Sequence, residues 1–529
     1  MSESEITIDK LKDPSIYKED VKSPEIIQTH ISYVVLTGEH AYKIKKPVDF
    51  GFLDFSTLEK RKKFCNEELI LNKRLCPQIY LDVVAVRKNG ECLKIDGDKG
   101  EVVDYAVKMN QFSQRNIMKN KLQKGEIRWE EIEDICDILV DFYRTEETSD
   151  EIKKYGEICT VKHNTDENFE QTKDIIDDVI SRESYGFIKK ITNDFLKEKN
   201  VFEKRIQNGF ILDCHGDLHS GNIVFLKGKK VCIFDCIEFN KRFRYGDVAS
   251  DIGFLAMDLD FQGFPYLSSY LVEKYVEKSE DKQIVDVLNF YKCYRAYVRG
   301  KVASFQLNDK NIEEKEKNKI SNTSSKYFDL SYYYAKLIDK TQLQSDRNIL
   351  FITAGLTGTG KTTVARKLSI DYGAEKISTD EVRKETRGIE KYERHFEEYD
   401  KGIYSPEKKY ETYMKVLERG RQKLKEDQNV VLDATFKNRE MRDKAKKIAD
   451  ENNADFLIIN TVCPEEKVKQ FLQQRIQKKS ISDGRWEVYE KQKNLFDYPS
   501  KDEKFVKINI TKNDLDYQLN AYNKILEKI

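Results

Sequence analysis

The apolar and polar positions in the first part of the chain predict short strands mixed with longer helices. Short apolar or alternating runs mark the strands, and apolar residues three to four positions apart mark the helices. The pattern is mainly helical from about 129 to 208, and Gly228 marks a turn between two later strands. Strands are expected at 33–36, 41–45, 80–85, 102–109, 223–225 and 231–234, with a helix at 58–75.

The pattern changes around residue 341. Before it, helical spacing predicts helices over 284–306 and around 332–337, and the polar stretch 308–325 is either a loop or an exposed helix end. After it, strands at 348–354, 375–379, 429–433, 456–461 and 505–510 alternate with helices. This alternation predicts an α/β domain with a parallel sheet covered on both faces. We therefore expect domains over 1–340 and 348–529, joined by a linker over 341–347.

Length and composition favour a folded protein with two or three domains. A chain of 529 residues is too long for one ordinary core. Charged residues make up 35% and aromatic residues 11%, which is typical of a globular protein with a strongly solvated surface. Lys+Arg and Asp+Glu both number 93, so the net charge is zero and nonspecific attraction to nucleic acid is not expected to dominate, although a local basic groove stays open.

The sequence carries no membrane or secretion signal that we can identify. No apolar run reaches the length that spans a bilayer, and the acidic start, residues 1–5, lacks the basic and apolar regions of a signal peptide. The ten cysteines are scattered and form no paired C-x-x-C set. We expect a cytoplasmic protein without a membrane partner.

A complete phosphate-binding loop, Gly355-Leu-Thr-Gly-Thr-Gly-Lys-Thr362, lies between an apolar strand and a helix. Glycines let the backbone wrap closely around phosphate oxygens, so that amide hydrogens and the helix N-terminus face the negative charge. Lys361 is expected to reach the outer phosphates, and Thr362 to help hold Mg²⁺. The predicted nucleotide-binding residues are Gly355, Gly358, Gly360, Lys361, Thr362 and Thr363.

Charged residues after this loop indicate a kinase. Asp380 ends a strand, where it can accept a hydroxyl proton, and Arg383 can bind a substrate anion; a helix cap with a surface arginine explains the pair equally well. Asp433 is suited to orienting Mg²⁺ through water, with a satisfied turn residue as the alternative. Arg475 is expected to bring positive charge onto the transferring phosphoryl group from a closing lid, although a solvated helix face accounts for it nearly as well.

A second phosphate-handling set lies well upstream, in His215-Gly-Asp-Leu-His-Ser-Gly-Asn222. Asp217 fits the base at an acceptor hydroxyl, while Asn222 and the strand-end Asp235 supply the hard oxygen ligands that Mg²⁺ prefers. His215 is expected to brace the loop by hydrogen bonding. His219 either does the same or stays at the surface.

The cation that the donor phosphates require is expected on an early strand, paired with a carboxylate on a helix. Lys43, in Ala41-Tyr-Lys43, is assigned this role, with Lys45 on the same strand face as the reserve. Glu68 is the expected partner, and Glu67 is the alternative. Lys43 and Glu68 are thus the predicted ATP-binding residues of this second site.

Two further pairs of charged residues do not identify the substrate that accepts the phosphoryl group. Asp247 and Asp251, one helical turn apart, are expected to anchor the catalytic loop, with attraction of a cationic acceptor as the alternative. Arg295 and Arg299 either answer these carboxylates, which we favour, or bind an anionic substrate. Because the two pairs imply opposite acceptor charges, we name no acceptor.

The region from about 346 to 529 resembles the P-loop kinase branch that contains polynucleotide kinase, zeta toxin and gluconate kinase-like proteins. The similarity rests on the phosphate-binding loop and on Ser378-Thr-Asp-Glu-Val-Arg383, Leu432-Asp-Ala-Thr435 and Ser482-Asp-Gly-Arg485. The loop is very specific for nucleotide binding, and the other segments are moderately specific for a subfamily. The acceptor varies widely across this branch, so the resemblance does not imply one.

The region from about 25 to 335 resembles the aminoglycoside phosphotransferase and choline kinase group of the protein-kinase-like fold. The matching segments are AYKIKK, NEEL, HGDLHSGN and IFDCIEF, and segments 45–55 and 294–301 are similar to a fused aminoglycoside phosphotransferase-like and P-loop ATPase family. The resemblance implies an N-terminal α+β kinase-like domain ahead of the P-loop domain. Cys236-Ile237 follows the metal aspartate in place of Phe-Gly, and no multi-glycine flap precedes Lys43, which favours a small-molecule acceptor over a protein.

Taken together, the sequence predicts a bifunctional ATP- and Mg²⁺-dependent phosphotransferase with two nucleotide sites that acts on small-molecule hydroxyl groups. A nucleotide-gated regulatory protein is the first alternative. The second is a C-terminal kinase of polynucleotide 5′-hydroxyl groups, which would make nucleic acid a partner of that domain.

Overall fold

The computed structural model describes residues 6–529 except 91, 229, 310–311, 344–346, 391, 394–400 and 477–480. The acidic start and the middle of the predicted linker therefore lie outside the described residues. Contacts divide the chain into two compact units, the first over Met1–Val161 and Phe202–Leu255, the second over Lys162–Val201 and Ala256–Ile529. These units are defined by packing and differ from the predicted domains, since helices on the N-terminal side of the linker pack within the second unit.

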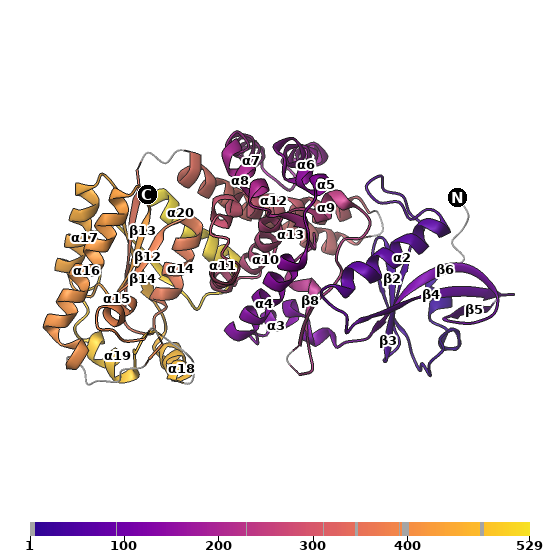
Figure 1. Ribbon diagram of the computed structural model, residues 1–529, viewed down its shortest axis with the longest axis horizontal. Helices are drawn as coiled ribbons and strands as arrows, with labels where there is room; N and C mark the ends of the chain where they lie inside the picture. Colours follow the sequence, from indigo (N-terminus) through magenta and orange to yellow (C-terminus); the bar gives the residue numbers. More distant parts are fainter. Residues whose placement is uncertain are drawn as a thin grey trace. The chain divides into compact units, whose positions relative to one another are not determined.

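The first unit contains a six-stranded antiparallel sheet in the order β1-β2-β3-β6-β4-β5 (Figure 1). Strand β3 lies inside the sheet, where Lys43 is opposite Val34 on β2 and Val107 on β6. Pairing on both sides fixes the register of β3 and therefore the direction of its side chains. The strands are β1 Glu25–Gln28, β2 Ser32–Leu36, β3 His40–Lys45, β4 Tyr80–Asn89, β5 Cys92–Ile95 and β6 Glu101–Asn110.

Helix α2, Leu58–Lys73, packs on this sheet and is capped by Thr57, whose hydroxyl accepts a hydrogen bond from Lys60 N. Further helices and two pairs of strands complete the unit. They are helices α1 Ile8–Leu11, α3 Met118–Gln123, α4 Trp129–Thr145, α5 Asp150–Lys153 and α9 Lys241–Arg244, and the antiparallel pairs β7 Ile211–Asp213 with β10 Tyr245–Asp247 and β8 Ile223–Leu226 with β9 Lys230–Ile233. Three helices include residues of both units, namely α6 Ile158–Gln171, α8 Lys199–Gln207 and α10 Val248–Phe261.

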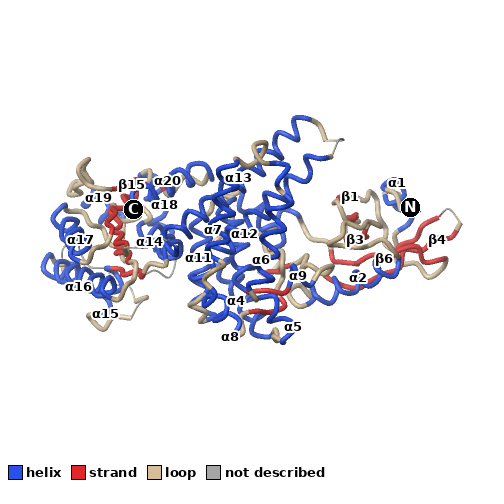
Figure 2. The backbone as a smooth tube through the Cα atoms, turned by 90° about the horizontal axis from the view of Figure 1, so that it is seen from above, coloured by secondary structure: helices blue, strands red, loops and turns tan. Residues whose placement is uncertain are grey.

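The second unit contains a five-stranded sheet in the order β12-β13-β11-β14-β15, in which every neighbouring pair is parallel. All six residues of the central strand β11 are buried. Helices α16 and α17 lie on one face of the sheet and α14 and α20 on the other (Figures 1 and 2), which confirms the predicted covering of both faces. The strands are β11 Ile349–Ala354, β12 Glu375–Ser378, β13 Val430–Asp433, β14 Asp455–Val462 and β15 Phe505–Asn509.

Helices of the same unit that precede the linker pack against helices α14 and α20 of the parallel sheet. Among them, α11 contacts α14, and α13 contacts α20. Helix α13 begins at Glu314, so the polar residues from there to Ser325 form an exposed helix end rather than a loop. The helices are α7 Arg182–Phe195, α11 Pro265–Ser279, α12 Ile284–Phe305, α13 Glu314–Ile338, α14 Lys361–Tyr372, α15 Thr379–Glu385, α16 Pro406–Lys425, α17 Arg439–Glu451, α18 Glu465–Ile476, α19 Trp486–Lys493 and α20 Leu515–Lys528.

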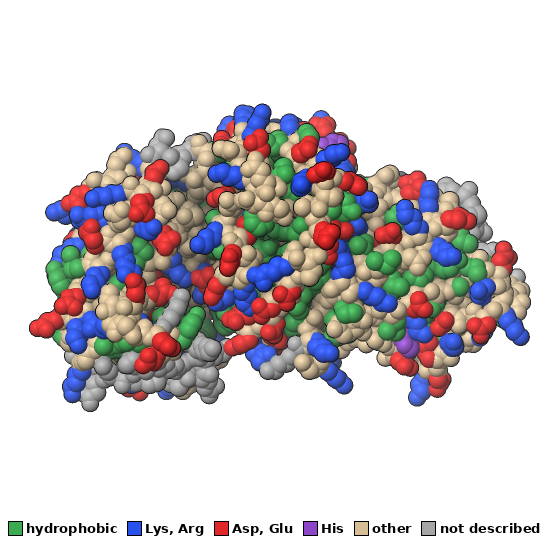
Figure 3. All heavy atoms as spheres, in the orientation of Figure 1, with side chains coloured by type: hydrophobic (Ala, Val, Ile, Leu, Met, Phe, Trp, Pro, Cys, Tyr) green, Lys and Arg blue, Asp and Glu red, His purple; other side chains and the backbone are tan. Residues whose placement is uncertain are grey.

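The surface agrees with the balanced charge of the sequence. On the face drawn in Figure 3, basic and acidic side chains of the described residues are interspersed. Across the described part of the chain, no helix is both long and apolar enough to cross a membrane.

Candidate active sites

Strand β3 and helix α2 bring two lysines and a glutamate together in the first unit. The Nζ atoms of Lys43 and Lys45 lie 2.8 Å from Oε1 and 2.7 Å from Oε2 of Glu68. Lys43 also lies 2.5 Å from Oδ1 of Asp235, whereas Lys45 pairs with Glu238. Lys43 is thus the lysine that faces the predicted metal ligand, and Lys45 supports the cluster from within.

The pKa values of this cluster follow from competition between burial and charge. Burial would raise the pKa of Glu68, but Lys43 and Lys45 outweigh it and hold that pKa at about 2. Burial would lower the pKa of Lys43, but Asp235 and Glu68 raise it well above its usual value. Lys43 and Glu68 therefore stay ionised at neutral pH. The lysines contact Glu68, so the open choice between Glu67 and Glu68 falls to Glu68.

The loop over residues 215–222 is held by hydrogen bonds to its backbone and side chains. His215 is fully buried, its Nε2 lies 3.0 Å from Phe234 O, and Asp217 N donates to its Nδ1 at 3.3 Å. Burial lowers the pKa of His215, which fits a neutral imidazole in this bracing role. The Nε2 of His219 lies 3.4 Å from Asp217 Oδ2. The expectation that His215 braces the loop is confirmed.

Helix α10 anchors the same loop through Asp251. Its two carboxylate oxygens accept hydrogen bonds from the amides of His215 at 2.7 Å and Gly216 at 3.0 Å. Asp247 has another partner, because Arg205 donates to both of its oxygens, at 3.0 and 2.7 Å. Asp251 therefore anchors the loop as expected, and Asp247 is held by an arginine that the sequence pattern did not reveal.

The predicted base and metal ligands of the first unit lie close together. Asn222 Nδ2 donates to the backbone oxygen and Oδ2 of Asp217 at 3.0 and 3.1 Å. Phe234 N donates to Asn222 O, which joins the end of β9 to the loop. Asp235 has a left-handed φ of 64°, unusual for a residue other than glycine and frequent at functional sites. The Tyr80 hydroxyl accepts a hydrogen bond from Asp235 N at 3.2 Å.

In the second unit, the phosphate-binding loop connects β11 to α14. Gly360 has a φ of 90°, and a Cβ there would lie 2.4 Å from Ile510 Cδ1, so both conformation and space require glycine. At Gly355 a Cβ would lie 2.5 Å from Thr461 Oγ1. Gly358, also at positive φ, lies in the same loop, and Thr363 belongs to the first turn of α14. Lys361 Nζ donates to Leu356 O at 2.8 Å and so lies over the loop.

The predicted partners of this loop surround it. Asp433, at the end of β13, accepts a hydrogen bond from Thr362, although burial raises the pKa of Asp433. Burial, opposed by Asp433 and Asp380 and helped by the charge of Arg475, lowers the pKa of Lys361 to about 8. Asp433 thus ends strand β13, and Asp380 belongs to helix α15, which follows β12, rather than ending that strand as predicted. Lys361 and Arg475 come from helices α14 and α18.

Asp380 and Arg383 form an ion pair in the first turns of α15. Arg383 Nη1 lies 2.5 Å from Asp380 Oδ1, and only 8% of the arginine side chain is exposed. Burial would raise the pKa of Asp380, but Arg383 and a hydrogen bond from Ser482 hold it below its usual value. Asp380 is thus ionised and oriented, as a base requires. Arg383 reaches this carboxylate; its predicted contact with a substrate anion stays a prediction.

Several residues near the loop carry no recognisable motif. Gln492 Oε1 accepts a hydrogen bond from the Thr357 amide at 2.9 Å. Tyr404 places its ring 4.8 Å from the Arg383 guanidinium, and its hydroxyl donates to Asp483 at 2.6 Å. The sequence did not reveal them because they are far from the phosphate-binding loop in the chain and reach it only through folding. The nearest sequence signal is the segment Ser482–Arg485, which resembles P-loop kinases and contains Asp483, the partner of Tyr404.

Two family models match parts of the chain. The phosphotransferase enzyme family matches residues 199–278, and a family described as an AAA domain matches residues 350–499. The first match includes Asp217, Asn222 and Asp235, and the second includes the phosphate-binding loop. These matches define the class of the protein, an ATP-dependent phosphotransferase.

Relatives extend the similarity over most of the chain. Uncharacterized proteins of Mycobacterium tuberculosis and Mycobacterium bovis are each 30% identical over 432 residues, which is 81% of this chain and 82% of theirs. The chain belongs to the same family as these proteins. Within its class it is an aminoglycoside phosphotransferase-like protein with a C-terminal P-loop kinase domain.

Solved structures show weaker similarity. A gluconokinase from Sinorhizobium meliloti is 16% identical with a TM-score of 0.24, covering 34% of this chain and 94% of that one. An ethanolamine kinase from Plasmodium vivax is 11% identical with a TM-score of 0.35, covering 58% of this chain and 81% of that one. TM-scores this low do not bear on function.

Proposed function

We propose that the protein is a bifunctional ATP- and Mg²⁺-dependent phosphotransferase whose two nucleotide sites act on small-molecule hydroxyl groups. The observation that carries the proposal is the presence of two separate phosphate-handling sets. One joins Lys43, Glu68 and Asp235 in the first unit, and the other joins the phosphate-binding loop to Asp433 in the second. Phosphoryl transfer needs positioned cations, metal ligands and a base at the acceptor. Each set, together with Asp217 or Asp380 as the proposed base, contains side chains suited to these roles.

For the first site, we propose that the antiparallel sheet, α2 and the 215–222 loop form a protein-kinase-like catalytic unit. Lys43, held by Glu68, would contact the donor phosphates. Asn222 and Asp235 would hold Mg²⁺, a fit supported by their hard oxygen atoms and by the use of Asn222 Nδ2 on Asp217, which leaves Oδ1 for the metal. Asp217 would accept the proton of the acceptor hydroxyl. Mg²⁺ would neutralise charge on the phosphate oxygens.

For the second site, we propose that Lys361 contacts the outer phosphates and that Thr362 and Asp433 hold Mg²⁺. The hydrogen bond between Thr362 and Asp433 supports this pairing. Asp380 would accept the acceptor proton, and Arg475 would stabilise charge on the transferring group, as its effect on the Lys361 pKa suggests. Arg383 would orient Asp380 and reach a substrate anion once one is bound.

Turnover of ATP with a pool of hydroxyl compounds tests the proposal, with products detected by the mass of one added phosphoryl group. Asp217→Asn and Lys361→Ala should each lower formation of a different product about a hundredfold or more, because each removes an essential group from one site. The exposed Asp82→Asn and Lys446→Ala are matched controls and should change neither product.

The same assay separates the alternatives. If both active-site variants turn over ATP like the parent protein, the proposal is wrong. Nucleotide binding without transfer to any acceptor would support a regulatory protein. Label transferred to an oligonucleotide 5′-hydroxyl and lost in Asp380→Asn would identify a polynucleotide kinase in the C-terminal region.

A further inference from the structure

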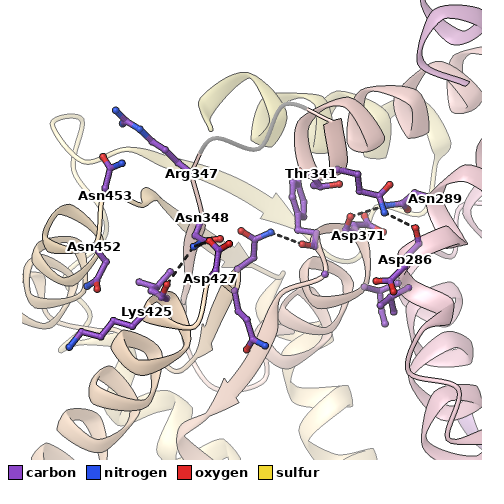
Figure 4. Close-up of a pocket in the computed structure, with 18 residues that line it drawn as sticks. Asp286, Asn289, Thr341, Arg347, Asn348, Asp371, Lys425, Asp427, Asn452 and Asn453 are labelled. Atoms are coloured by element: carbon purple, nitrogen blue, oxygen red, sulfur yellow. Dashed lines mark hydrogen bonds between the residues drawn. The ribbon is translucent and has the colours of Figure 1, made fainter. Parts of the chain in front are cut away.

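A polar pocket of about 580 Å³ lies in the second unit, away from the phosphate-binding loop (Figure 4). Asn348 and Asn429, which line it, precede strands β11 and β13, whereas the loop and Asp433 lie at the opposite ends of those strands. In a parallel sheet, the N-terminal ends of the strands lie on the opposite side from their C-terminal ends. The pocket is therefore separate from the nucleotide site. Figure 4 shows Asp286 and Asn289 on one side, and Asn348 and Asp427 across from them.

Three buried polar atoms of its lining residues have no hydrogen-bond partner among the residues that the structure describes. They are Oδ1 of Asn289, Oε1 of Gln342 and the hydroxyl of Tyr372. The amide nitrogens are already used, since Asn289 donates to Asp371 O at 2.9 Å and Gln342 to Asp286 O at 2.8 Å. Asn289 is only 3% exposed. A buried acceptor without a donor is costly, so these atoms indicate a ligand that brings hydrogen-bond donors.

The electrostatics of the pocket favour positive charge on that ligand. Helices α14, α16 and α17 end at the pocket, where Gly373, Lys425 and Asn452 line it. Helix C-termini carry partial negative charge. Asp286 and Asp427 add two carboxylates, whereas the carboxylate of Asp371 is already paired with Lys367. Two exposed cations, Lys425 and Arg347, and the N-terminus of α12 oppose them.

We propose that this pocket binds a small organic cation with several N–H donors, of the amine or polyamine class. The two amide oxygens would accept hydrogen bonds from its N–H groups. The helix ends and carboxylates would stabilise its charge. Both requirements must be met together, so a cation without N–H groups should bind poorly.

Calorimetric titration of the full chain with spermidine tests the proposal, with tetramethylammonium at matched ionic strength as a cation that lacks N–H donors. Spermidine should bind at one site and tetramethylammonium should not. Gln342→Met removes the acceptor at similar length and should weaken spermidine binding about tenfold. Gln342→Glu adds a carboxylate and should tighten it.

Two further variants change exposed residues, so that an effect on binding does not come from a loss of folding. Asp427→Asn, at an exposed position, should weaken binding severalfold, while the matched control Gln123→Met on α3 should change nothing. The proposal is overturned if spermidine does not bind, which would leave water as the occupant. It is also overturned if tetramethylammonium binds as well, or if neither Gln342 substitution alters the affinity.

Discussion

Lys43 and Lys45 lie two positions apart on β3, yet their surroundings differ. Only 1% of the Lys45 side chain is exposed between Glu68 and Glu238, whereas 14% of Lys43 is exposed beside Asp235. A lysine enclosed by buried carboxylates contributes mainly to stability, because removing it leaves their charges uncompensated. Lys43 lies beside Asp235, the proposed metal ligand, and we expect it to contribute mainly to catalysis.

Lys45→Met should therefore lower the free energy of unfolding by about 3 kcal/mol or more, measured by urea denaturation. Lys43→Met should lower kcat/KM for ATP with a smaller loss of stability. Adding Glu238→Gln to Lys45→Met should restore part of the lost stability, since it removes the charge left unpaired. A larger loss of stability in Lys43→Met and a larger loss of kcat/KM in Lys45→Met would show that the roles of the two lysines are exchanged.

Lys361 has a pKa of about 8 because burial disfavours its charge. Below this pH the lysine is already charged, and nucleotide binding should take up no proton there. Above it the free protein has lost the proton, and bound phosphate restores it, so binding should take up as much as one proton and weaken as the pH rises. Calorimetry in buffers of different ionisation enthalpy measures this uptake. Lys361→Ala should abolish it, and uptake that persists in that variant would exclude Lys361 as its source.

At the scale of elements, one glutamate joins three of them in the second unit. Glu273 on α11 lies 2.5 Å from Arg366 Nε on α14 and 2.6 Å from Lys376 Nζ on β12. Burial would raise the pKa of Glu273, but these two cations hold it at about 2. The helix that carries Lys361 at its N-terminus is thus tied to α11 by charge as well as by packing.

Glu273→Gln should reduce stability by about 2 kcal/mol at neutral pH, because it removes charge-assisted hydrogen bonds to two partly buried cations. The pKa of Glu273 is lower in the folded protein than its usual value of 4.5, so its stabilisation is present above that value and is lost as the pH falls toward 2. Acid denaturation followed by circular dichroism should show a flatter pH dependence in the variant. Glu277→Gln, exposed on the same helix, is the control, and an equal effect there would contradict the assignment.

At the scale of the whole molecule, segments that precede the predicted linker contact the helices of the P-loop sheet. Asn289 on α12 and Tyr333 on α13 both hydrogen-bond to Asp371 on α14, and Gln518 on α20 donates to Gly263 O. A fragment of residues 348–529 would expose these groups and the apolar faces around them. We expect it to melt at a lower temperature than a fragment of residues 256–529, as measured by calorimetry. Equal melting temperatures would show that the P-loop sheet is stable without these helices.

Much of the fold followed from local patterns. The strands over β2, β3, β4 and β6 and all five strands of the parallel sheet lie where apolar runs predict them. Strands β1 and β5 were not predicted, because each is short and lies at an edge of its sheet, where one side is solvated and the apolar signal is weak. The placement of the linker and of the domain limits stays a prediction.

The sequence by itself determined the two phosphate-handling motifs. Their chemistry depends on residues close together in the chain, on glycines at positive φ and on strand ends that place carboxylates at one edge. Tertiary structure alone decided that Lys43 rather than Lys45 meets Asp235, that Arg205 holds Asp247 and that unpartnered amide oxygens line a polar pocket. These pairings join residues far apart in sequence, and which faces meet is set by the packing of whole elements, a property that no local pattern records.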